Sequence, residues 1–184
     1  MNINENERLV ATLCAGGVAI IPSDTIYGIV GRADLHDTVV RIRDIKKREM
    51  DQAFVVLCAD IDQVKKLAHI NDKVSGIVTR YWPGPNTVIL QPKKALPEIQ
   101  GLLEGIGFRI PDKKDLRSLL RQTGPLVAPS ANPKGQRPAS TIQEAQEYFG
   151  DAVDVYVDGG AIQDIKPSRI IKLFDTGTEE IVRN

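Results

Sequence analysis

One stretch near the N-terminus decides the fold class, and it reads Val18-Ala19-Ile20-Ile21-Pro22-Ser23-Asp24-Thr25-Ile26-Tyr27-Gly28. Its four apolar residues, 18–21, predict a short buried strand that ends at Pro22. A hydroxyl-rich turn follows at residues 22–28, and α/β proteins usually bind ligands at such strand ends. Ser, Asp and Thr also form turns simply by capping backbone groups. The turn alone therefore leaves a ligand site and a purely structural turn equally open.

Helical and extended patterns alternate on either side of this strand. The expected helices are residues 4–15, 35–45, 62–68, 72–81, 114–122 and 141–149. The expected strands are residues 18–21, 54–57, 87–90, 107–110, 126–128, 153–157, 169–173 and 179–182, the last two forming a hairpin. Strands that alternate with helices and then cluster at the end imply a mixed sheet with helices packed on it. We therefore predict an α/β fold in a single domain, residues 1–184.

Length and composition exclude several classes of protein. The 184 residues are 42% hydrophobic and 26% charged, which excludes wholesale disorder. Lys plus Arg and Asp plus Glu are each 24, so a uniformly basic nucleic-acid coat is excluded, although a local basic patch is not. No apolar run approaches the ~18 residues that a membrane span needs, and the polar N-terminus does not resemble a signal peptide. We expect a cytoplasmic protein with no membrane partner.

Common catalytic and metal signatures are absent from the sequence. There is no P-loop pattern, and Gly105-Ile106-Gly107 is followed by Phe108-Arg109 where a dinucleotide fingerprint needs a helix to begin. The two histidines lie far in sequence from any hydroxyl or thiol nucleophile, so no catalytic triad can be argued. The two cysteines and two histidines lack zinc spacing. We expect no metal site built from protein ligands.

Several polar segments at element ends remain as candidates. Residues 46–49 (Lys-Lys-Arg-Glu) end the second expected helix, where cations also favour the helix dipole without any ligand. Residues 129–135 offer a hydroxyl, an amide and close backbone approach. Taken together, five side chains suit an anionic ligand held by fixed donors: Lys46, Arg48, Arg109, Ser130 and Asn132.

In this combination the sequence resembles the YrdC-like family, the threonylcarbamoyl-AMP synthases. The matching segments follow the family's order: P-S-D-T-I-Y-G at 22–28, K-K-R at 46–48, W-P-G-P-N-T at 82–87, F-R-I-P at 108–111, S-A-N at 130–132, and D-G-G at 158–160 with P-S at 167–168. Each motif alone is weak, but six in order with matching spacing are a strong signal. The resemblance covers essentially the whole chain.

The resemblance implies one α/β domain whose twisted mixed sheet forms a concave, basic cavity of the YrdC/RibB-like kind. It implies condensation of L-threonine, bicarbonate or CO2, and ATP into threonylcarbamoyl-adenylate and pyrophosphate, with Mg2+ accompanying ATP. A TsaD-like transferase would then move the threonylcarbamoyl group to a tRNA adenosine. Catalysis would come from positioning and charge neutralisation, with no protein nucleophile.

The resemblance also implies roles for individual residues. The implied ATP-binding residues are Lys46, Arg48, Gln52, Ser130, Asn132 and Arg183. The implied threonine-binding residues are Thr25, Arg109 and Ser168. Lys46 and Arg48 would be the catalytic residues, because they would neutralise the charge of the triphosphate.

The sequence departs from the family's pattern at Ser23, Glu49, Gln52, Leu57, Pro129 and Arg169. Glu49 matters most, because it places a carboxylate beside the implied phosphate site. Two other functions stay open: a divergent relative that binds tRNA, dsRNA or a nucleotide without this activity, and a carbamoyl-transfer module like a domain of hydrogenase-maturation proteins. Zero net charge and 5% aromatic residues argue against a broad RNA surface.

Overall fold

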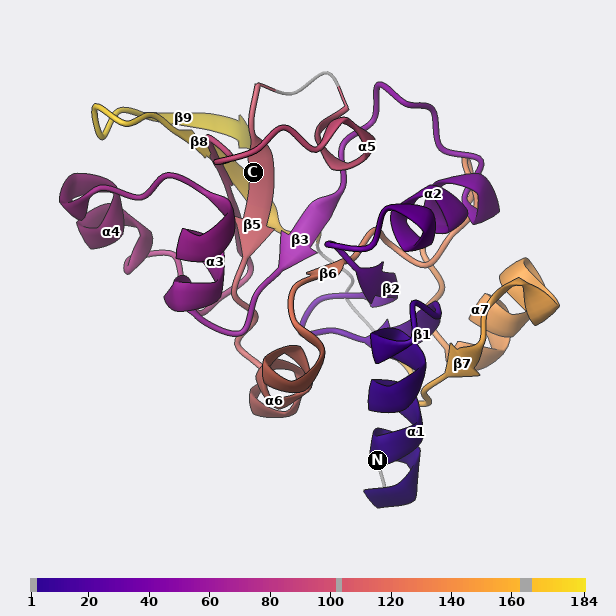
Figure 1. Ribbon diagram of the computed structural model, residues 1–184. Helices are drawn as coiled ribbons and strands as arrows, with labels where there is room; N and C mark the ends of the chain where they lie inside the picture. The colour runs from indigo at the N-terminus through magenta and orange to yellow at the C-terminus, as the bar shows by residue number, and fades with distance from the viewer. Residues whose placement is uncertain (1–2, 102–103, 163–166) are drawn as a thin grey trace.

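The computed structural model describes residues 3–101, 104–162 and 167–184 (Figure 1). The helices are α1 (Ile3–Cys14), α2 (His36–Ile45), α3 (Ile61–Leu67), α4 (Asp72–Val78), α5 (Pro97–Gln100), α6 (Lys114–Thr123) and α7 (Ile142–Phe149). The strands are β1 (Ala19–Pro22), β2 (Tyr27–Arg32), β3 (Val55–Leu57), β4 (Asn86–Leu90), β5 (Ile106–Arg109), β6 (Leu126–Val127), β7 (Val155–Tyr156), β8 (Arg169–Leu173) and β9 (Glu179–Arg183). The expected helices and strands are all present, some of them shortened.

The nine described strands form one sheet in the order β7-β1-β2-β6-β3-β5-β4-β8-β9. The pairs β1–β7, β3–β5 and β4–β8 are parallel, and the other neighbours are antiparallel. Figure 1 shows α3 and α4 near the β8–β9 end of the sheet, and α1 and α7 near the β1–β7 end. The predicted α/β class with a mixed sheet is confirmed, as is the C-terminal hairpin of β8 and β9.

Alternate residues of the strands belong to two separate apolar layers. Ile20 and Val56 pack in one layer, together with buried residues of α2, α3, α4, α5 and α7. Ile21 and Leu57 pack in the other layer, whose helices are α1 and α6. On this second face, β4 and β5 contribute Thr87, Ile89, Gly107 and Arg109 to the lining of a cavity. The sheet therefore has one face covered by five helices and one face that is hollowed beside α1 and α6.

Strand β2 was not predicted from the sequence, because its first two residues, Tyr27 and Gly28, were assigned to the turn at residues 22–28. Gly31 permits close packing in this strand, since a Cβ atom there would lie 2.4 Å from the Thr38 methyl group on α2. The short helix α5 was also not predicted. Helix α2 ends at Ile45, as predicted, so residues 46–49 follow it, and Lys47 among them takes a left-handed φ of 50°.

Side-chain caps fix where three of the helices begin. Asp60 accepts a hydrogen bond from the Gln63 N–H at the start of α3, and Asn71 accepts one from the Val74 N–H at the start of α4. Thr141 accepts from the Glu144 N–H at the start of α7. Such caps satisfy backbone donors that have no partner within the helix.

Candidate active site

A cavity of about 240 Å³ lies on the hollowed face of the sheet. Six of the predicted site residues line it: Thr25, Arg48, Arg109, Ser130, Ser168 and Arg183. Two of the other three, Lys46 and Asn132, contact Ser130 from outside the lining. Gln52 lies next to Arg48 and accepts from it through its backbone carbonyl. Residues up to 158 positions apart in the chain are thus brought to one place.

The turn after β1 is held by the Ser23 hydroxyl. Its oxygen accepts from the backbone N–H groups of Thr25 and Ile26, both at 3.0 Å, and its hydrogen is donated to the Ile26 carbonyl at 2.6 Å. The Lys113 ammonium group donates to the Pro22 carbonyl at 3.3 Å. The structural interpretation of this turn is therefore right for Ser23, whereas Thr25 lines the cavity and its hydroxyl accepts from Arg109.

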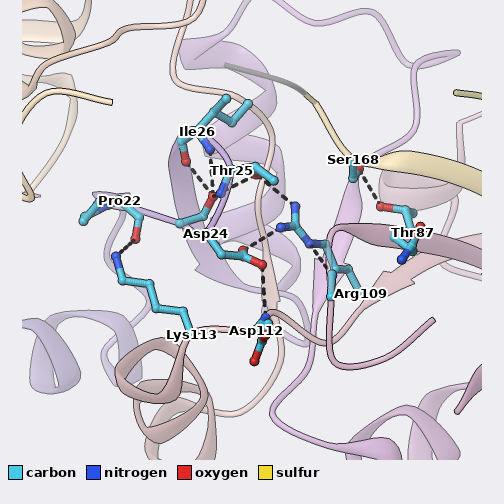
Figure 2. A network of polar contacts seen from close by, with 12 residues as sticks. Pro22, Asp24, Thr25, Ile26, Thr87, Arg109, Asp112, Lys113 and Ser168 are labelled. Atoms are coloured by element: carbon cyan, nitrogen blue, oxygen red, sulfur yellow. Dashed lines mark hydrogen bonds and ion pairs between the residues drawn. The ribbon is translucent and has the colours of Figure 1, made fainter. Parts of the chain in front are cut away.

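Arg109 is the centre of the first of two polar clusters (Figure 2). It ends β5 and is 5% exposed. One terminal nitrogen, Nη1, donates to Thr25 Oγ1 at 3.0 Å, and Nε donates to the Gly84 carbonyl at 3.2 Å. The other terminal nitrogen lies 2.5 Å from Asp24 Oδ1, an ion pair that is not aligned as a hydrogen bond. We call Asp24, Thr25 and Arg109 the Arg109 cluster.

The Asp24 carboxylate gives the Arg109 cluster its charge balance. Its second oxygen, Oδ2, accepts from the Asp112 N–H at 3.0 Å, while Oδ1 faces the Arg109 guanidinium in the ion pair. Both side chains of the ion pair are nearly buried, 6% exposed for Arg109 and 11% for Asp24. A buried charge is tolerated when it is paired and hydrogen-bonded. The cluster is therefore close to neutral before any ligand binds.

A hydroxyl pair lies beside this cluster. Thr87 Oγ1 on β4 and Ser168 Oγ are 2.8 Å apart, and both side chains are buried (Figure 2). Arg183 on β9 donates from Nε and Nη2 to the Ser168 carbonyl, at 3.2 and 2.7 Å. Each hydroxyl can donate and accept, so the pair can offer one further hydrogen bond to a ligand.

Lys46 is the centre of the second cluster. It lies directly after α2 and is 4% exposed. Its ammonium group donates to the carbonyls of Ser130 and Asn132 at 2.5 and 2.6 Å, and the Ser130 hydroxyl donates to Asn132 Oδ1 at 2.5 Å. Burial, and then the charge of Arg48, lower the pKa of Lys46 to about 7. Lys46 therefore ties the end of α2 to the S-A-N loop.

Arg48 completes this second group, and we call Lys46, Arg48, Ser130 and Asn132 the Lys46 cluster. Arg48 donates to the carbonyls of Ala53 at 2.5 Å and Gln52 at 3.4 Å, and it lies 5.1 Å from the centroid of the Phe54 ring. Burial and the neighbouring Arg43 lower the pKa of Arg48. Within residues 3–101, 104–162 and 167–184, no carboxylate forms an ion pair with Lys46 or Arg48. The cluster therefore carries a positive charge, permanent on Arg48, that no ion-paired carboxylate compensates and that suits an anionic ligand.

Comparison with known proteins decides the family. A family model named Sua5/YciO/YrdC, described as "Telomere recombination", matches residues 11–184. The chain belongs to the Sua5/YciO/YrdC family. It is 35% identical over 166 residues to a threonylcarbamoyl-AMP synthase of Marinobacter nauticus, covering 88% of this chain and 87% of the relative. It is 34% identical over 179 residues to a putative threonylcarbamoyl-AMP synthase of Methanocaldococcus jannaschii, covering 94% and 85%.

A solved structure extends this similarity to three dimensions. The crystal structure of P. abyssi Sua5 complexed with L-threonine has a TM-score of 0.84 against this Sua5/YciO/YrdC protein, at 26% identity. The alignment covers 91% of this chain and 50% of the Sua5 chain, so the present chain spans half of that protein's length. The predicted family resemblance is confirmed over most of the sequence.

Two residues of this Sua5/YciO/YrdC site were not among the sequence candidates. Asp24 was interpreted only as a turn former, and Thr87 as the last residue of the W-P-G-P-N-T segment. Both residues lie inside the family motifs at 22–28 and 82–87. Their polar side chains within these motifs were the signal that could have identified them as site residues. Glu49, which departs from the family's pattern, points its carboxylate at Lys134 (3.0 Å), and both side chains are exposed.

Within residues 3–101, 104–162 and 167–184, no group of three or more His, Cys, Asp or Glu side chains could hold a metal ion. The described helices of this Sua5/YciO/YrdC protein include none with the length and apolar character to cross a membrane. That Mg2+ accompanies ATP stays a prediction.

Proposed function

We propose that this protein is a threonylcarbamoyl-AMP synthase, which condenses L-threonine, bicarbonate or CO2, and ATP into threonylcarbamoyl-adenylate and pyrophosphate. One observation carries the proposal: the cavity joins a charge-balanced arginine cluster to an uncompensated Lys–Arg cluster. A near-neutral cluster suits a zwitterionic amino acid, and uncompensated cations suit a polyphosphate. The names of the two relatives and the threonine bound to P. abyssi Sua5 support the same assignment.

The Arg109 cluster would bind threonine. The Arg109 guanidinium would pair with the threonine carboxylate or with the carbamate formed from its amine, as planar guanidinium groups do well. The Thr25 hydroxyl and the Ser168–Thr87 pair would form hydrogen bonds to the remaining polar groups of threonine. These hydroxyls suit a polar amino acid better than an aliphatic one, which would leave them unpaired.

The Lys46 cluster would bind ATP. Arg48 would contact the triphosphate, and Lys46 would act partly through the loop that it holds, since two of its ammonium hydrogens already bind carbonyls. Ser130, Asn132, Gln52 and Arg183 would fix the nucleotide around this loop. Mg2+ would enter with ATP, coordinated mainly by the phosphates, as is usual for this ion.

The chemistry needs no protein nucleophile. The threonine amine would attack CO2, forming an N–C bond and releasing a proton to solvent or ATP. A carbamate oxygen would then attack the α-phosphorus of ATP, and the bond to pyrophosphate would break. The protein would contribute fixed cations that neutralise charge on carboxylate and phosphate, together with alignment of the reactants. A TsaD-like transferase in the cytoplasm would take the adenylate onward to tRNA.

Pyrophosphate release tests the proposal directly. Purified protein with ATP, magnesium and bicarbonate should release pyrophosphate only when L-threonine is added, and Arg48→Ala should abolish most of this release. The adjacent exposed Lys47→Asn variant is the control, because asparagine tolerates the left-handed backbone there. If the wild type binds ATP but releases nothing with threonine, the protein is instead a divergent relative with another amine or RNA as its ligand.

A further inference from the structure

Arg43 is a buried arginine on α2 whose hydrogen-bond acceptors are all backbone carbonyls. It is 4% exposed, and it donates from Nη1 to the carbonyls of Glu49 and Gln52, the latter at 3.1 Å. Its Nη2 atom donates to the Glu98 carbonyl on α5. Across the described segments, Arg43 forms no ion pair with a carboxylate. An arginine buried in this way is costly to maintain, which points to a specific role.

The contacts of Arg43 are shared with Arg48. Both guanidinium groups lie over the Phe54 ring, at 4.6 Å for Arg43 and 5.1 Å for Arg48. Both donate to the same Gln52 carbonyl, and the Arg48 N–H donates to the Arg43 carbonyl at 2.9 Å. The position of Arg48 therefore depends on a carbonyl and a ring that Arg43 also holds.

Helix α5 and the residue after it support the same loop from the other side. The Phe54 N–H donates to the Ile99 carbonyl at 2.8 Å. Gly101 has a φ of 58°, and a Cβ atom there would lie 2.4 Å from the Asp51 carbonyl oxygen. Residues 46–53 are thus fixed between α2 and α5, with Arg43 linking the two helices through this loop.

We propose that Arg43 is a positioning residue, which holds the loop of residues 46–53 so that Arg48 faces the cavity with the correct orientation for a polyphosphate. The inference rests on the proposed function of the Lys46 cluster. The planar guanidinium of Arg43 has N–H donors in fixed directions, which allows it to bind three carbonyls while it stacks on Phe54. A lysine keeps the charge but offers neither the fork nor the stacking, so it should replace Arg43 only in part.

The test compares Arg43→Lys and Arg43→Gln with Arg41→Gln as a matched control. Arg41 lies on the same helix, pairs with Asp154 and is not among the residues that line the cavity. Calorimetry measures the Kd of inorganic tripolyphosphate, and the pyrophosphate assay measures KM for ATP and for threonine. A misplacement of a positioned group by about 1 Å can lower a reaction rate ~10²-fold. We expect an effect of similar size on affinity, so Arg43→Gln should raise the Kd of tripolyphosphate about 10²-fold and Arg43→Lys about tenfold. KM for ATP should rise in parallel, with KM for threonine unchanged.

The outcomes separate this inference from the proposed function. If a folded Arg43→Lys variant binds tripolyphosphate with the Kd of the wild type, the inference is overturned. The same variant decides the question if Arg43→Gln does not fold. Equal rises in KM for ATP and threonine would also overturn it, because they indicate general loosening. If the wild type released no pyrophosphate, the proposed function would fail, yet the tripolyphosphate measurement would still decide the role of Arg43.

Discussion

Arg109 and Arg48 both line the same cavity, but they differ in what surrounds them. Arg109 has a carboxylate at 2.5 Å, and that carboxylate is itself hydrogen-bonded. Arg48 and its neighbour Lys46 have only backbone carbonyls as acceptors in the described parts of the chain. A carbonyl dipole satisfies the N–H groups of a cation without cancelling its charge. The charge of the Arg109 cluster is therefore balanced within the protein, whereas the Lys46 cluster keeps a positive charge that an anionic ligand would balance.

This difference separates two roles that a single sequence pattern cannot distinguish. A cation with its own carboxylate contributes to the stability of the fold and orients a ligand. A cation without one contributes mainly to binding and to the stabilisation of developing charge. Substitution of Arg109 should therefore change mainly the free energy of unfolding, and substitution of Arg48 mainly the kinetics.

Replacing Arg109 by methionine should lower the free energy of unfolding by about 3–5 kcal/mol, because Asp24 would be left buried without its partner. Urea unfolding followed by circular dichroism measures this change. The double variant Asp24→Asn/Arg109→Met should recover part of the loss, since the asparagine carries no charge. An Arg109→Met protein as stable as the wild type would show that Asp24 finds other compensation, and the contrast with Arg48 would fail.

Replacing Arg48 by alanine should lower kcat/KM for ATP by about 10²–10³-fold, as for the loss of one preorganised charged donor. The free energy of unfolding should stay within about 1 kcal/mol of the wild type, because no carboxylate is stranded. Steady-state kinetics and urea unfolding of the same preparation give both numbers. A large loss of stability with little change in kinetics would reverse the assignment of the two regions.

The sequence predicted the fold class, most elements and the identity of the cavity cations, because apolar periodicity and motif order are local signals. It did not predict β2, whose first residues were assigned to the turn at 22–28 and whose Gly31 packs closely against α2. It also could not show that Asp24 pairs with Arg109, since 85 positions separate them and only the folded sheet brings them together. The different charge balance of the two regions depends on such long-range contacts. For the same reason, the sequence could not show that the Lys46 ammonium group also binds the carbonyls of Ser130 and Asn132, and its role toward ATP stays a prediction.

Binding of ATP should weaken about tenfold as the pH rises through the pKa of Lys46, about 7, since a hydrogen bond loses strength when its donor loses its charge. Burial lowers this pKa, so the folded protein releases the proton at a lower pH than the unfolded chain does. The unfolded chain then binds more protons above about pH 7, and the contribution of Lys46 to stability rises with pH in that window. Calorimetric titration with tripolyphosphate at several pH values measures the affinity.

The Lys46→Arg variant is the control for this pH dependence, because arginine stays charged throughout. Its affinity should change with pH only as far as the titration of the ligand itself requires. Identical pH profiles for the wild type and Lys46→Arg would show that Lys46 does not contribute its charge to binding. In that case Lys46 would only hold the S-A-N loop through hydrogen bonds to the Ser130 and Asn132 carbonyls. A neutral amine can still form both bonds, because it keeps two N–H donors.

The ion pair between Glu49 and Lys134 should have only a small effect on ATP binding at the Lys46 cluster. Both side chains are exposed, so the pair should contribute at most about 1 kcal/mol to stability. Glu49 nevertheless follows Arg48 directly, and it adds a negative charge beside the uncompensated region. Glu49→Gln should therefore lower KM for ATP about two- to threefold at low salt, and Lys134→Gln should raise it by a similar factor. Shifts of KM in the same direction would mean that the two side chains act through the structure of the loop. An electrostatic effect on a polyanion instead predicts shifts of opposite sign that both disappear at high salt.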